Sequence, residues 1–458
     1  MRKPLRPLIV GAGPAGIRAA EALADAGIRP ILVDEASLGG GQIYRQRLVP
    51  DERTPQDLYG SEARKATALH ATLSRLADRI DYLPQALVWN IRRDVADVAV
   101  GGRTRPIRFS HLILATGATD RVLPLPGWTM PGVFTLGGAQ ISLKSQGCSI
   151  GERAVFLGSG PLLYLVAWQY MKAGARIAAV LDTAPLAAKF HLLRGLPLQP
   201  GIVLRGFRYA AELMARGVQV RFGVEPVRIE GGSRVTGLVW RERGRERHVA
   251  CDAVGYGLAL RSETQLADLA GCRFVFDERD RAWRPDHDKA GRSGTPGIYL
   301  AGDGARIAGA DAAELAGERA ALALLEDAGF PVDGAHVDRL ERRLAAIHRF
   351  RTILERAFPF PRDWADRLAD NVVLCRCEEV SVGQVRAAAQ DLGVTELNRL
   401  KALTRVGMGR CQGRMCGSAA AEILASASGG SPEAVGRLRA QAPIKPLPLD
   451  IVSEGEAA

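Results

Sequence analysis

The chain has 458 residues, of which 47% are hydrophobic and 24% charged, and it contains 51 glycines. This length allows roughly two to four domains around a large core, and the composition is typical of an α/β enzyme rather than of a fibrous or disordered chain. The formal charge of +11 comes mostly from dispersed arginines among only 6% aromatic residues, which argues against nucleic-acid binding.

The N-terminus predicts the first strand of a mature protein rather than a signal peptide. It reads "MRKPLRPLIVGAGPAG", basic and then apolar, and no small-residue cleavage site follows the apolar run. No stretch approaches about 18 apolar residues without a charge, so no transmembrane helix is expected. We therefore expect a cytoplasmic protein, either free or peripheral to the inner face of the membrane.

A dinucleotide-binding loop follows this strand. Gly11, Gly13 and Gly16 fit G-x-G-x-x-G: the first allows a tight turn, the second lets a pyrophosphate approach the backbone, and the third lets helix and strand pack closely. The N-terminus of the next helix faces the phosphates with its positive dipole end. The second predicted strand, "PILV", leads into Asp34, whose carboxylate can accept from a ribose 2′-hydroxyl; Glu35 is the less favoured acid.

Three later segments favour FAD over NAD in this loop. "GGGQIYRQ" follows the acid, one buried strand ends in "ATG" at residues 115–117, and another ends in "AGD" at residues 301–303 before a helix. An acid at the end of a strand, in front of a helix N-terminus, suits a ribityl hydroxyl. The predicted FAD-binding residues are Gly11, Gly13, Pro14, Ala15, Gly16, Asp34, Glu35, Gly41, Gln42, Val88, Ala115, Thr116, Gly117, Gly302, Asp303 and Ala310.

These segments together resemble the two-dinucleotide-binding-domain flavoproteins, which include thioredoxin reductase and nitrite reductase, over residues 5 to about 328. The resemblance implies that Asp303 binds the ribityl chain. It also implies that the helix after Ala310 points at the pyrimidine ring of the flavin, where its dipole favours the anionic reduced form.

A second glycine loop is altered. Residues 158–163 read "GSGPLL", so Leu163 stands where the third glycine is expected. A leucine there should push helix and strand apart or fill the pocket. Asp182 still ends the following strand. The pattern leaves three interpretations open: an NAD(P) site, a site for another nucleotide such as ATP, and a structural remnant.

Four of the seven cysteines cluster near the C-terminus, in "LCRCEEV" and "GMGRCQGRMCG". An apolar, extended first stretch would turn Cys375 and Cys377 to the same side, and the glycines around Cys411 and Cys416 allow the second stretch to wrap a ligand. Two short helices are expected between the pairs, and a helix with Ser418 as its cap after them. No Cys-x-x-Cys occurs in the first 370 residues, which argues against a dithiol–disulfide reductase. The other cysteines, Cys148, Cys251 and Cys272, are interpreted as isolated, reduced core residues.

Three kinds of site compete for the four thiols. Disulfides are disfavoured in a cytoplasmic chain, and structural zinc sites usually use C-x₂₋₄-C at both ends. A [2Fe–2S] cluster takes four thiolates and is the favoured assignment, with Cys375, Cys377, Cys411 and Cys416 as ligands. Nearby arginines would balance its negative charge: Arg376, Arg405, Arg410 and Arg414.

The layout C-x-C, 33 residues, C-x₄-C resembles the bacterioferritin-associated-ferredoxin-like [2Fe–2S] domain, many members of which have C-x₂-C at the second pair. With "GGGQIYR" and "AGDGARIAGADAA" upstream, the chain resembles the α or A subunits of opine oxidases, proline and hydroxyproline dehydrogenases and hydrogen cyanide synthase. Larger relatives carry a further N-terminal ferredoxin-like domain, so a separate small [2Fe–2S] subunit would supply it here.

The expected fold is an α/β two-dinucleotide-binding-domain flavoprotein, thioredoxin-reductase-like, with a small α-rich cluster domain. The expected divisions are an FAD domain in two parts (1–149 and 272–328), an inserted NAD(P)-like domain (150–271), a helical linker (329–370), the cluster domain (371–430) and a proline-rich tail (431–458).

The resemblance implies an FAD and [2Fe–2S] electron-transfer subunit of a heteromeric, dye-linked amino-acid or imino-acid dehydrogenase. Substrate would be oxidised on a partner β subunit of the glycine-oxidase-like FAD type, and a quinone or dye would accept the electrons. No catalytic residue is assigned to this chain. Two alternatives stay open: a stand-alone NAD(P)H-dependent flavin and iron–sulfur reductase, and a non-redox assembly scaffold.

Overall fold

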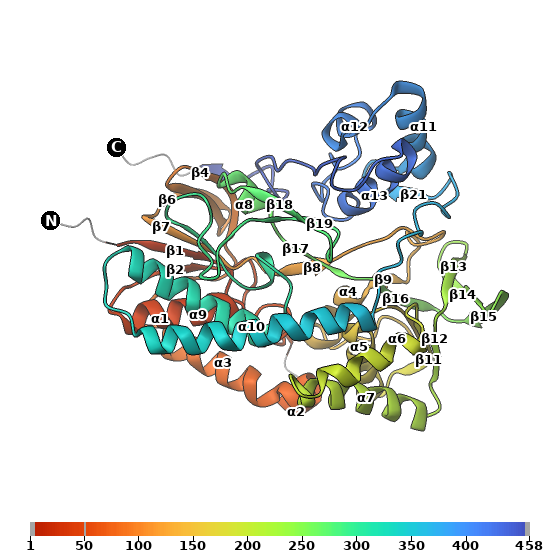
Figure 1. The fold of residues 1–458 in the computed structure, drawn as a ribbon, viewed down its shortest axis with the longest axis horizontal. Helices are drawn as coiled ribbons and strands as arrows, with labels where there is room; N and C mark the ends of the chain where they lie inside the picture. Colours follow the sequence, from red (N-terminus) through yellow and green to blue (C-terminus); the bar gives the residue numbers. More distant parts are fainter. Residues whose placement is uncertain (1–4, 50–51, 454–458) are drawn as a thin grey trace.

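The computed structural model describes residues 5–49 and 52–453, and its central element is a parallel sheet in the order β20-β7-β1-β2-β3 (Figure 1). Its strands are β1 (Pro7–Val10), β2 (Ile31–Val33), β3 (Asp81–Leu83), β7 (His111–Leu114) and β20 (Ile298–Leu300). The helices associated with it are α1 (Pro14–Asp25), α2 (Pro55–Tyr59), α3 (Ala63–Arg75) and α9 (Ala310–Asp327). The predicted strand at residues 8–10 is present, and so are the two later strands, which end at Leu114 and Leu300, just before the "ATG" and "AGD" segments in which they are expected to end.

Both faces of this sheet are buried, and successive side chains of its strands point alternately into two different cores. Ile9 and Ile113 pack in one core with α1 and α9, whereas Leu8 and Leu112 pack in another with a smaller antiparallel sheet. That sheet contains β4 (Leu87–Arg92), β5 (Val95–Val100) and β6 (Arg103–Arg108), and β23 (Val452–Ser453) from the C-terminal tail joins its edge. Side chains two apart on a strand share a face, so one short apolar strand serves two cores.

Helices α1 and α9 approach each other unusually closely. A Cβ added at Gly317 of α9 would lie 1.9 Å from the main-chain oxygen of Ala15 in α1. Glycine is therefore required here by close backbone packing. Because β1, β7 and β20 are parallel, they end on the same side of the sheet, and α1 and α9 begin after β1 and β20 on that side.

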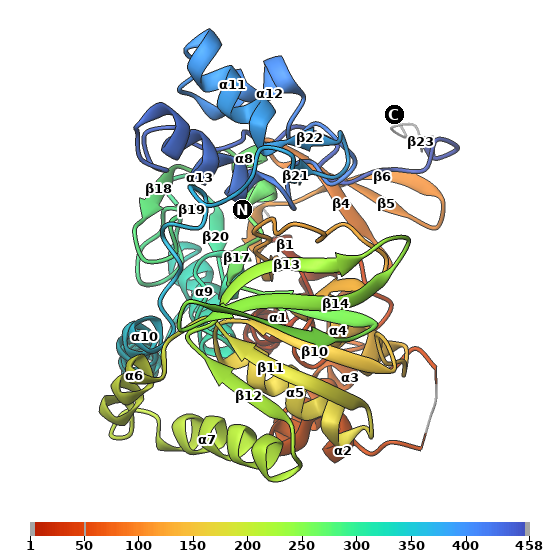
Figure 2. The ribbon, with the colours of Figure 1, turned by 90° about the vertical axis from the view of Figure 1, so that its right-hand side faces the viewer.

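The second parallel sheet has the order β12-β11-β10-β16-β9. Its strands are β9 (Val133–Thr135), β10 (Arg153–Gly158), β11 (Arg176–Asp182), β12 (Gln219–Phe222) and β16 (Ala253–Gly257), with helices α4 (Leu136–Ser145), α5 (Pro161–Lys172), α6 (Leu186–Lys189) and α7 (Pro200–Ala215). A three-stranded antiparallel sheet, β13 (Glu225–Gly231), β14 (Val235–Glu242) and β15 (Arg245–Ala250), extends from this part (Figure 2). Strand β9 lies on the N-terminal side of the expected boundary at residue 150.

The chain returns to the first sheet through short elements held by ion pairs. These elements are β8 (Ala118–Asp120) with β17 (Leu260–Ser262), α8 (Gln265–Leu269), and β18 (Phe274–Asp277) with β19 (Ala282–Pro285).

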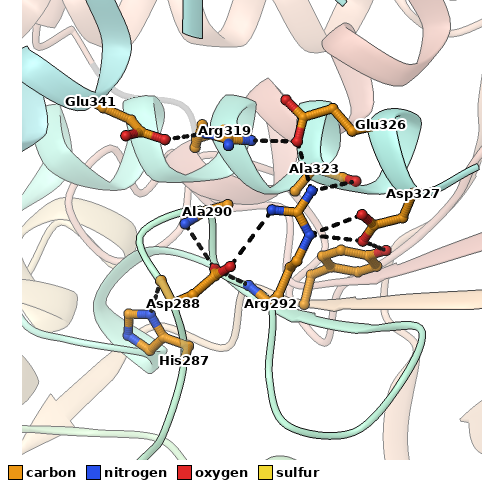
Figure 3. A network of polar contacts seen from close by, with 10 residues as sticks. His287, Asp288, Ala290, Arg292, Arg319, Ala323, Glu326, Asp327 and Glu341 are labelled. Atoms are coloured by element: carbon orange, nitrogen blue, oxygen red, sulfur yellow. Dashed lines mark hydrogen bonds and ion pairs between the residues drawn. The ribbon is translucent and has the colours of Figure 1, made fainter. Parts of the chain in front are cut away.

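Ion pairs on α9 hold the segments that follow. Arg292 donates to Asp327 at 2.9 Å and to Glu326 at 2.6 Å on α9 (Figure 3). Arg319 on α9 donates to Glu341 at 3.0 Å on α10 (Gly334–Ala357). The predicted linker helix is thus present and is bound along the flavin-type domain.

The C-terminal unit has its own hydrophobic core, to which Leu123 also contributes. It contains β21 (Val373–Cys375), β22 (Val380–Ser381), α11 (Val382–Leu392), α12 (Leu397–Thr404) and α13 (Gly417–Ser428). In Figure 1 these helices lie at the opposite end of the molecule from α2 and α7. The two helices predicted between the thiol pairs are present. No helix in the part of the chain that the structure describes is long and apolar enough to cross a bilayer.

Two local predictions in this unit are wrong. Strand β21 ends at Cys375, and Cys377 lies in the following turn, so the two thiols are not brought together by a continuous strand. Helix α13 begins at Gly417 with Cys416 at its N-cap, so Ser418 lies inside the first turn and is not the cap. Strand β21 ends, and helix α13 begins, one or two residues earlier than the sequence pattern predicts. The loops that carry the cysteines determine where the chain turns.

Candidate flavin and iron–sulfur sites

Two glycines of the first loop lie in close contact with the main chain, as the G-x-G-x-x-G spacing predicts. Gly11 has a φ of +108°, and a Cβ added there would lie 2.3 Å from the main-chain oxygen of Ala115. A Cβ at Gly16 would lie 1.8 Å from the oxygen of Gly11. Both glycines are thus required by the protein itself, for the turn and for the close approach of α1 to β1. Pro14 occupies the first position of α1, where its missing N–H costs no hydrogen bond.

Gly13 differs, because little of the protein surrounds it. A Cβ there would meet only the Cα of Gly41, at 3.6 Å. Gly41 belongs to the "GGGQIYRQ" segment, which is held over the loop by a 2.8 Å hydrogen bond from the N–H of Gly40 to the oxygen of Ala12. Gln42 is exposed beside it. The two glycine segments therefore form one backbone-lined cradle, and the space over Gly13 is open to a ligand.

Asp34 directly follows β2, as predicted, and both oxygens of its carboxylate accept hydrogen bonds from main-chain N–H groups. It accepts from the N–H of Ala12 at 2.5 Å and of Ala36 at 2.7 Å. Burial raises the pKa of this carboxyl, and the two main-chain hydrogen bonds oppose the rise. Glu35 points elsewhere and pairs with Lys445 of the C-terminal tail. Of the two candidate acids, only Asp34 is thus tied to the glycine loop.

The far end of the cradle is built from β7, β20 and α9. Asp303 follows β20 and accepts through Oδ1 from the N–H groups of Ala308 at 2.8 Å and Gly309 at 3.0 Å. Burial raises its pKa. Within the described residues, no hydrogen bond is made by its Oδ2. Gly309 caps α9, so Ala310 begins that helix. Asp303 and the positive end of the α9 dipole therefore lie together, as the predicted contact with flavin requires.

The remaining predicted flavin residues fall into two groups. Ala115, Thr116, Gly117 and Gly302 border the cradle, and a Cβ at Gly117 would meet nothing within 4 Å despite its φ of +72°. Val88 lies in β4, pairs with Val98 and is buried in the core behind the first sheet. Its side chain packs in this core, so any contact with a cofactor would involve its main chain.

The four C-terminal thiols are neighbours. Cys416 lies within hydrogen-bonding reach of Cys375 and Cys411, and Cys411 of Cys377. A hydrogen bond from Cys416 and main-chain N–H groups of the loops lower the pKa of the Cys375 thiol to about 6. The pKa of Cys411 is also lowered, chiefly by Cys416. Burial raises the pKa of Cys377, and hydrogen bonds with Cys375 and Cys411 raise the pKa of Cys416. The proximity of the four thiols, rather than their pKa values, is what suits a metal centre.

Glycines allow the two thiol-bearing segments to meet. A Cβ at Gly409 would lie 2.2 Å from the Cβ of Cys377. Gly407 and Gly413 have φ values of +81° and +77°, and both face Leu438 of the tail. Among the described residues, no three His, Cys, Asp or Glu side chains are grouped as a site for one metal ion. A two-iron cluster does not require three protein ligands on one metal ion, since each iron takes two protein thiolates.

The predicted arginines around the thiols are not equivalent. Arg414 donates to Glu263 at 2.8 Å in the interior, Arg405 pairs with Glu378 at 2.7 Å, and the Arg376 guanidinium lies 5.8 Å from the ring centre of Trp128. Arg410 is exposed. Of the other cysteines, Cys251 and Cys272 are buried as predicted, but Cys148 is exposed. That prediction is wrong because Cys148 follows the end of α4, in a loop.

In the second glycine loop, protein occupies the third glycine position and the acid, although a Cβ added at Gly160 would meet nothing within 4 Å. Leu163 is fully buried in the core between helices and sheet. Asp182, also fully buried, accepts from the hydroxyl of Tyr164 at 2.6 Å and pairs with Lys189 at 2.7 Å. The Nζ of Lys189 lies 3.5 Å from the ring centre of Phe358, which follows α10. The carboxylate that would bind a ribose is thus used internally.

Comparisons with known proteins agree with this architecture. The chain matches the pyridine nucleotide-disulphide oxidoreductase family over residues 6–317 and the BFD-like [2Fe-2S] binding domain over residues 373–426. It is 38% identical to the A subunit of opine oxidase from Rhizobium meliloti, over 96% of this chain and 86% of that protein. It is 35% identical to the HcnB subunit of hydrogen cyanide synthase from Pseudomonas aeruginosa, over 97% of each. The chain belongs to the family of opine oxidase A subunits, within the pyridine nucleotide-disulphide oxidoreductases.

Its fold is also that of L-proline dehydrogenase from P. horikoshii, with a TM-score of 0.73 over 98% of this chain and 80% of that one at 20% identity. Family membership makes the chain an oxidoreductase subunit with FAD and a [2Fe–2S] cluster. The residues present fit both groups: the space over Gly13 and Gly117 is free of protein, Asp303 keeps one oxygen available, and four thiols adjoin one another.

Replacing Gly13 by valine should remove FAD and leave the iron–sulfur spectrum unchanged. The branched side chain would occupy the open space of the cradle, while the thiols belong to a unit with its own core. Released flavin would be measured after heat treatment, with iron content measured in parallel. Gly232→Ala is the matched control, since a Cβ there meets nothing and the residue lies in the β13–β14 turn. Stoichiometric FAD in the valine variant would contradict the assignment of this loop.

Proposed function

We propose that this chain is the electron-transferring subunit of a heteromeric, dye-linked dehydrogenase or oxidase that acts on amino or imino acids. The substrate would be of the opine, proline, hydroxyproline or glycine type. Oxidation of the C–N bond would take place on a partner β subunit with its own glycine-oxidase-like flavin. The names of the relatives support this proposal, because they are subunits of opine oxidase and hydrogen cyanide synthase.

The observation that carries the proposal is the fixed docking of the thiol-bearing unit on the flavin-type domain. Glu422 of α13 is buried and accepts from Arg121 at 3.0 Å and from Arg281 at 2.6 and 2.9 Å. These arginines come from the flavin-type domain, and Phe360 covers the guanidinium of Arg121 at 4.4 Å. Such a contact supports two redox sites held at a constant separation, which is what passage of electrons between them needs.

The internal bonds of Asp182 and the burial of Leu163 argue against the alternative of an NAD(P)H-dependent reductase. A nicotinamide dinucleotide needs a carboxylate free for its ribose and a glycine at the third loop position. Here Asp182 is bonded to Tyr164 and Lys189, and Leu163 fills the interface. The scaffold alternative is disfavoured by the intact cradle and the four adjoining thiols. A quinone or dye is the proposed acceptor, and a small ferredoxin-like [2Fe–2S] subunit the proposed third component.

The isolated chain should therefore show no dye reduction with opines, proline, hydroxyproline or glycine. Co-expression with a glycine-oxidase-like flavoprotein partner should give activity with one of these classes, because only the partner would hold the substrate site. Dichlorophenolindophenol reduction across the panel measures this. Steady turnover by the isolated chain would place the active site here instead. Rapid bleaching of its flavin by NADH would favour the reductase alternative.

A further inference from the structure

One short segment, residues 260–265, touches both redox sites. On the flavin side, the N–H of Glu263 donates to the oxygen of Gly117 at 2.9 Å, and the hydroxyl of Thr116 donates to the oxygen of Glu263 at 2.6 Å. The hydroxyl of Ser262 donates to the main-chain oxygen of Asp303 at 2.6 Å. The main chain of Glu263 thus holds the loop that follows β7, and the hydroxyl of Ser262 holds the loop that follows β20.

On the cluster side, the same segment uses its side chains. The carboxylate of Glu263 accepts from Nε of Arg414 at 2.8 Å and lies 3.7 Å from Nη2 of Arg261. Nε of Arg261 donates to the main-chain oxygen of Arg414 at 3.1 Å. The amide of Gln265 donates to the oxygen of Gln412 at 2.8 Å. Arg414 and Gln412 both lie between Cys411 and Cys416, so these contacts fasten the cluster loop itself.

The two guanidinium groups are not fully satisfied by this arrangement. In the part of the chain that the structure describes, Nη2 of Arg261 and Nη2 of Arg414 are buried and have no hydrogen-bond partner. A buried donor without a hydrogen-bond partner is unfavourable. Arg261 also interacts electrostatically with Cys411 and Cys416. A negatively charged group at these thiols would be attracted to the two guanidinium groups, and a [2Fe–2S] cluster held by four thiolates is such a group.

We propose that Glu263 is the positioning residue that joins the flavin site to the cluster, and that Arg261 and Arg414 stabilise the charge of the reduced cluster. This inference rests on the proposed electron-transfer function. The main chain of Glu263 fixes the flavin-side loops, and its carboxylate holds the arginines against the cluster loop. The carboxylate also offsets their positive charge, so the net charge beside the cluster, and hence its reduction potential, depends on all three residues.

Opposite charge changes at this junction should shift the cluster potential in opposite directions. One-electron reduction adds a negative charge, so Glu263→Gln, which removes a negative neighbour, should favour the reduced state. Arg261→Gln should disfavour it, and Arg261→Lys should stay near the unaltered chain. We expect changes of about tenfold in the reduction equilibrium, which is about 59 mV for one electron. Midpoint potentials would be measured on the anaerobically purified holoprotein by redox titration with electron paramagnetic resonance.

The control is Glu230→Gln, which breaks ion pairs with Arg228 and His248 in the β13–β14–β15 sheet and should leave the potential unchanged. An unaltered chain without an iron–sulfur signal would contradict the proposed function. A normal signal with the same potential in Glu263→Gln and Arg261→Gln would contradict only the role of the junction. Shifts of equal sign in these two variants would also overturn it, since a general loosening of the loop has no charge dependence.

Discussion

Replacing Glu422 by alanine should detach the cluster unit or unfold the chain. Its carboxylate lies between Arg121 and Arg281, and the side chains of Glu422 and Arg121 are only 3% and 2% exposed. Removing one partner of a buried ion pair leaves uncompensated charge and costs about 3–5 kcal/mol. We expect a loss of that size in the free energy of unfolding, measured by urea denaturation with separate flavin and iron–sulfur signals.

Glu433→Ala is the matched control, since Glu433 is an exposed residue in the tail that directly follows this unit. It should change stability by less than about 0.5 kcal/mol. If Glu422→Ala instead keeps the midpoint of the unaltered chain, the triad does not hold the two parts together. If the iron–sulfur transition alone moves to lower urea, the unit is docked through this contact but folds independently.

Replacing Cys377 by serine should remove most of the iron or alter its spectrum. The four thiols adjoin one another, and Gly409 packs on the Cβ of Cys377. Another cysteine could therefore replace Cys377 as a ligand only if the loop changed its conformation. The unaltered chain should contain about two irons and give a rhombic signal of one spin when reduced. Metal analysis and electron paramagnetic resonance after anaerobic purification measure both quantities.

Cys148→Ser is the control for this substitution, because Cys148 is exposed and lies in the α4–β10 connection. It should change neither iron content nor signal. About one zinc per chain with no iron would contradict the cluster assignment. A full iron content in Cys377→Ser, with an unchanged signal, would mean that Cys377 is not a ligand.

Local spacing predicted the parts of the molecule that depend on neighbours in the chain. The positive φ of Gly11 and the contact of Gly16 with Gly11 lie within one strand–turn–helix unit, and Asp34 and Asp303 follow short buried strands, so a linear pattern is enough to locate them. The wrong predictions share one cause. The strand expected through Cys377, the cap expected at Ser418 and the buried position expected for Cys148 each depended on where a loop turns, which neighbouring segments decide.

The sequence by itself determined that this protein has a flavin-type glycine loop and a four-thiol site, because both are written in fixed spacings of glycine and cysteine. Only the tertiary structure decided how they are joined and that Asp182, at the second glycine loop, is bonded to Tyr164 and Lys189. Arg121 and Glu422 are 301 positions apart, and Arg414 and Glu263 are 151 apart. A single acid or arginine in a loop carries no periodic signal, so its partner can be known only when folding brings the two side chains together.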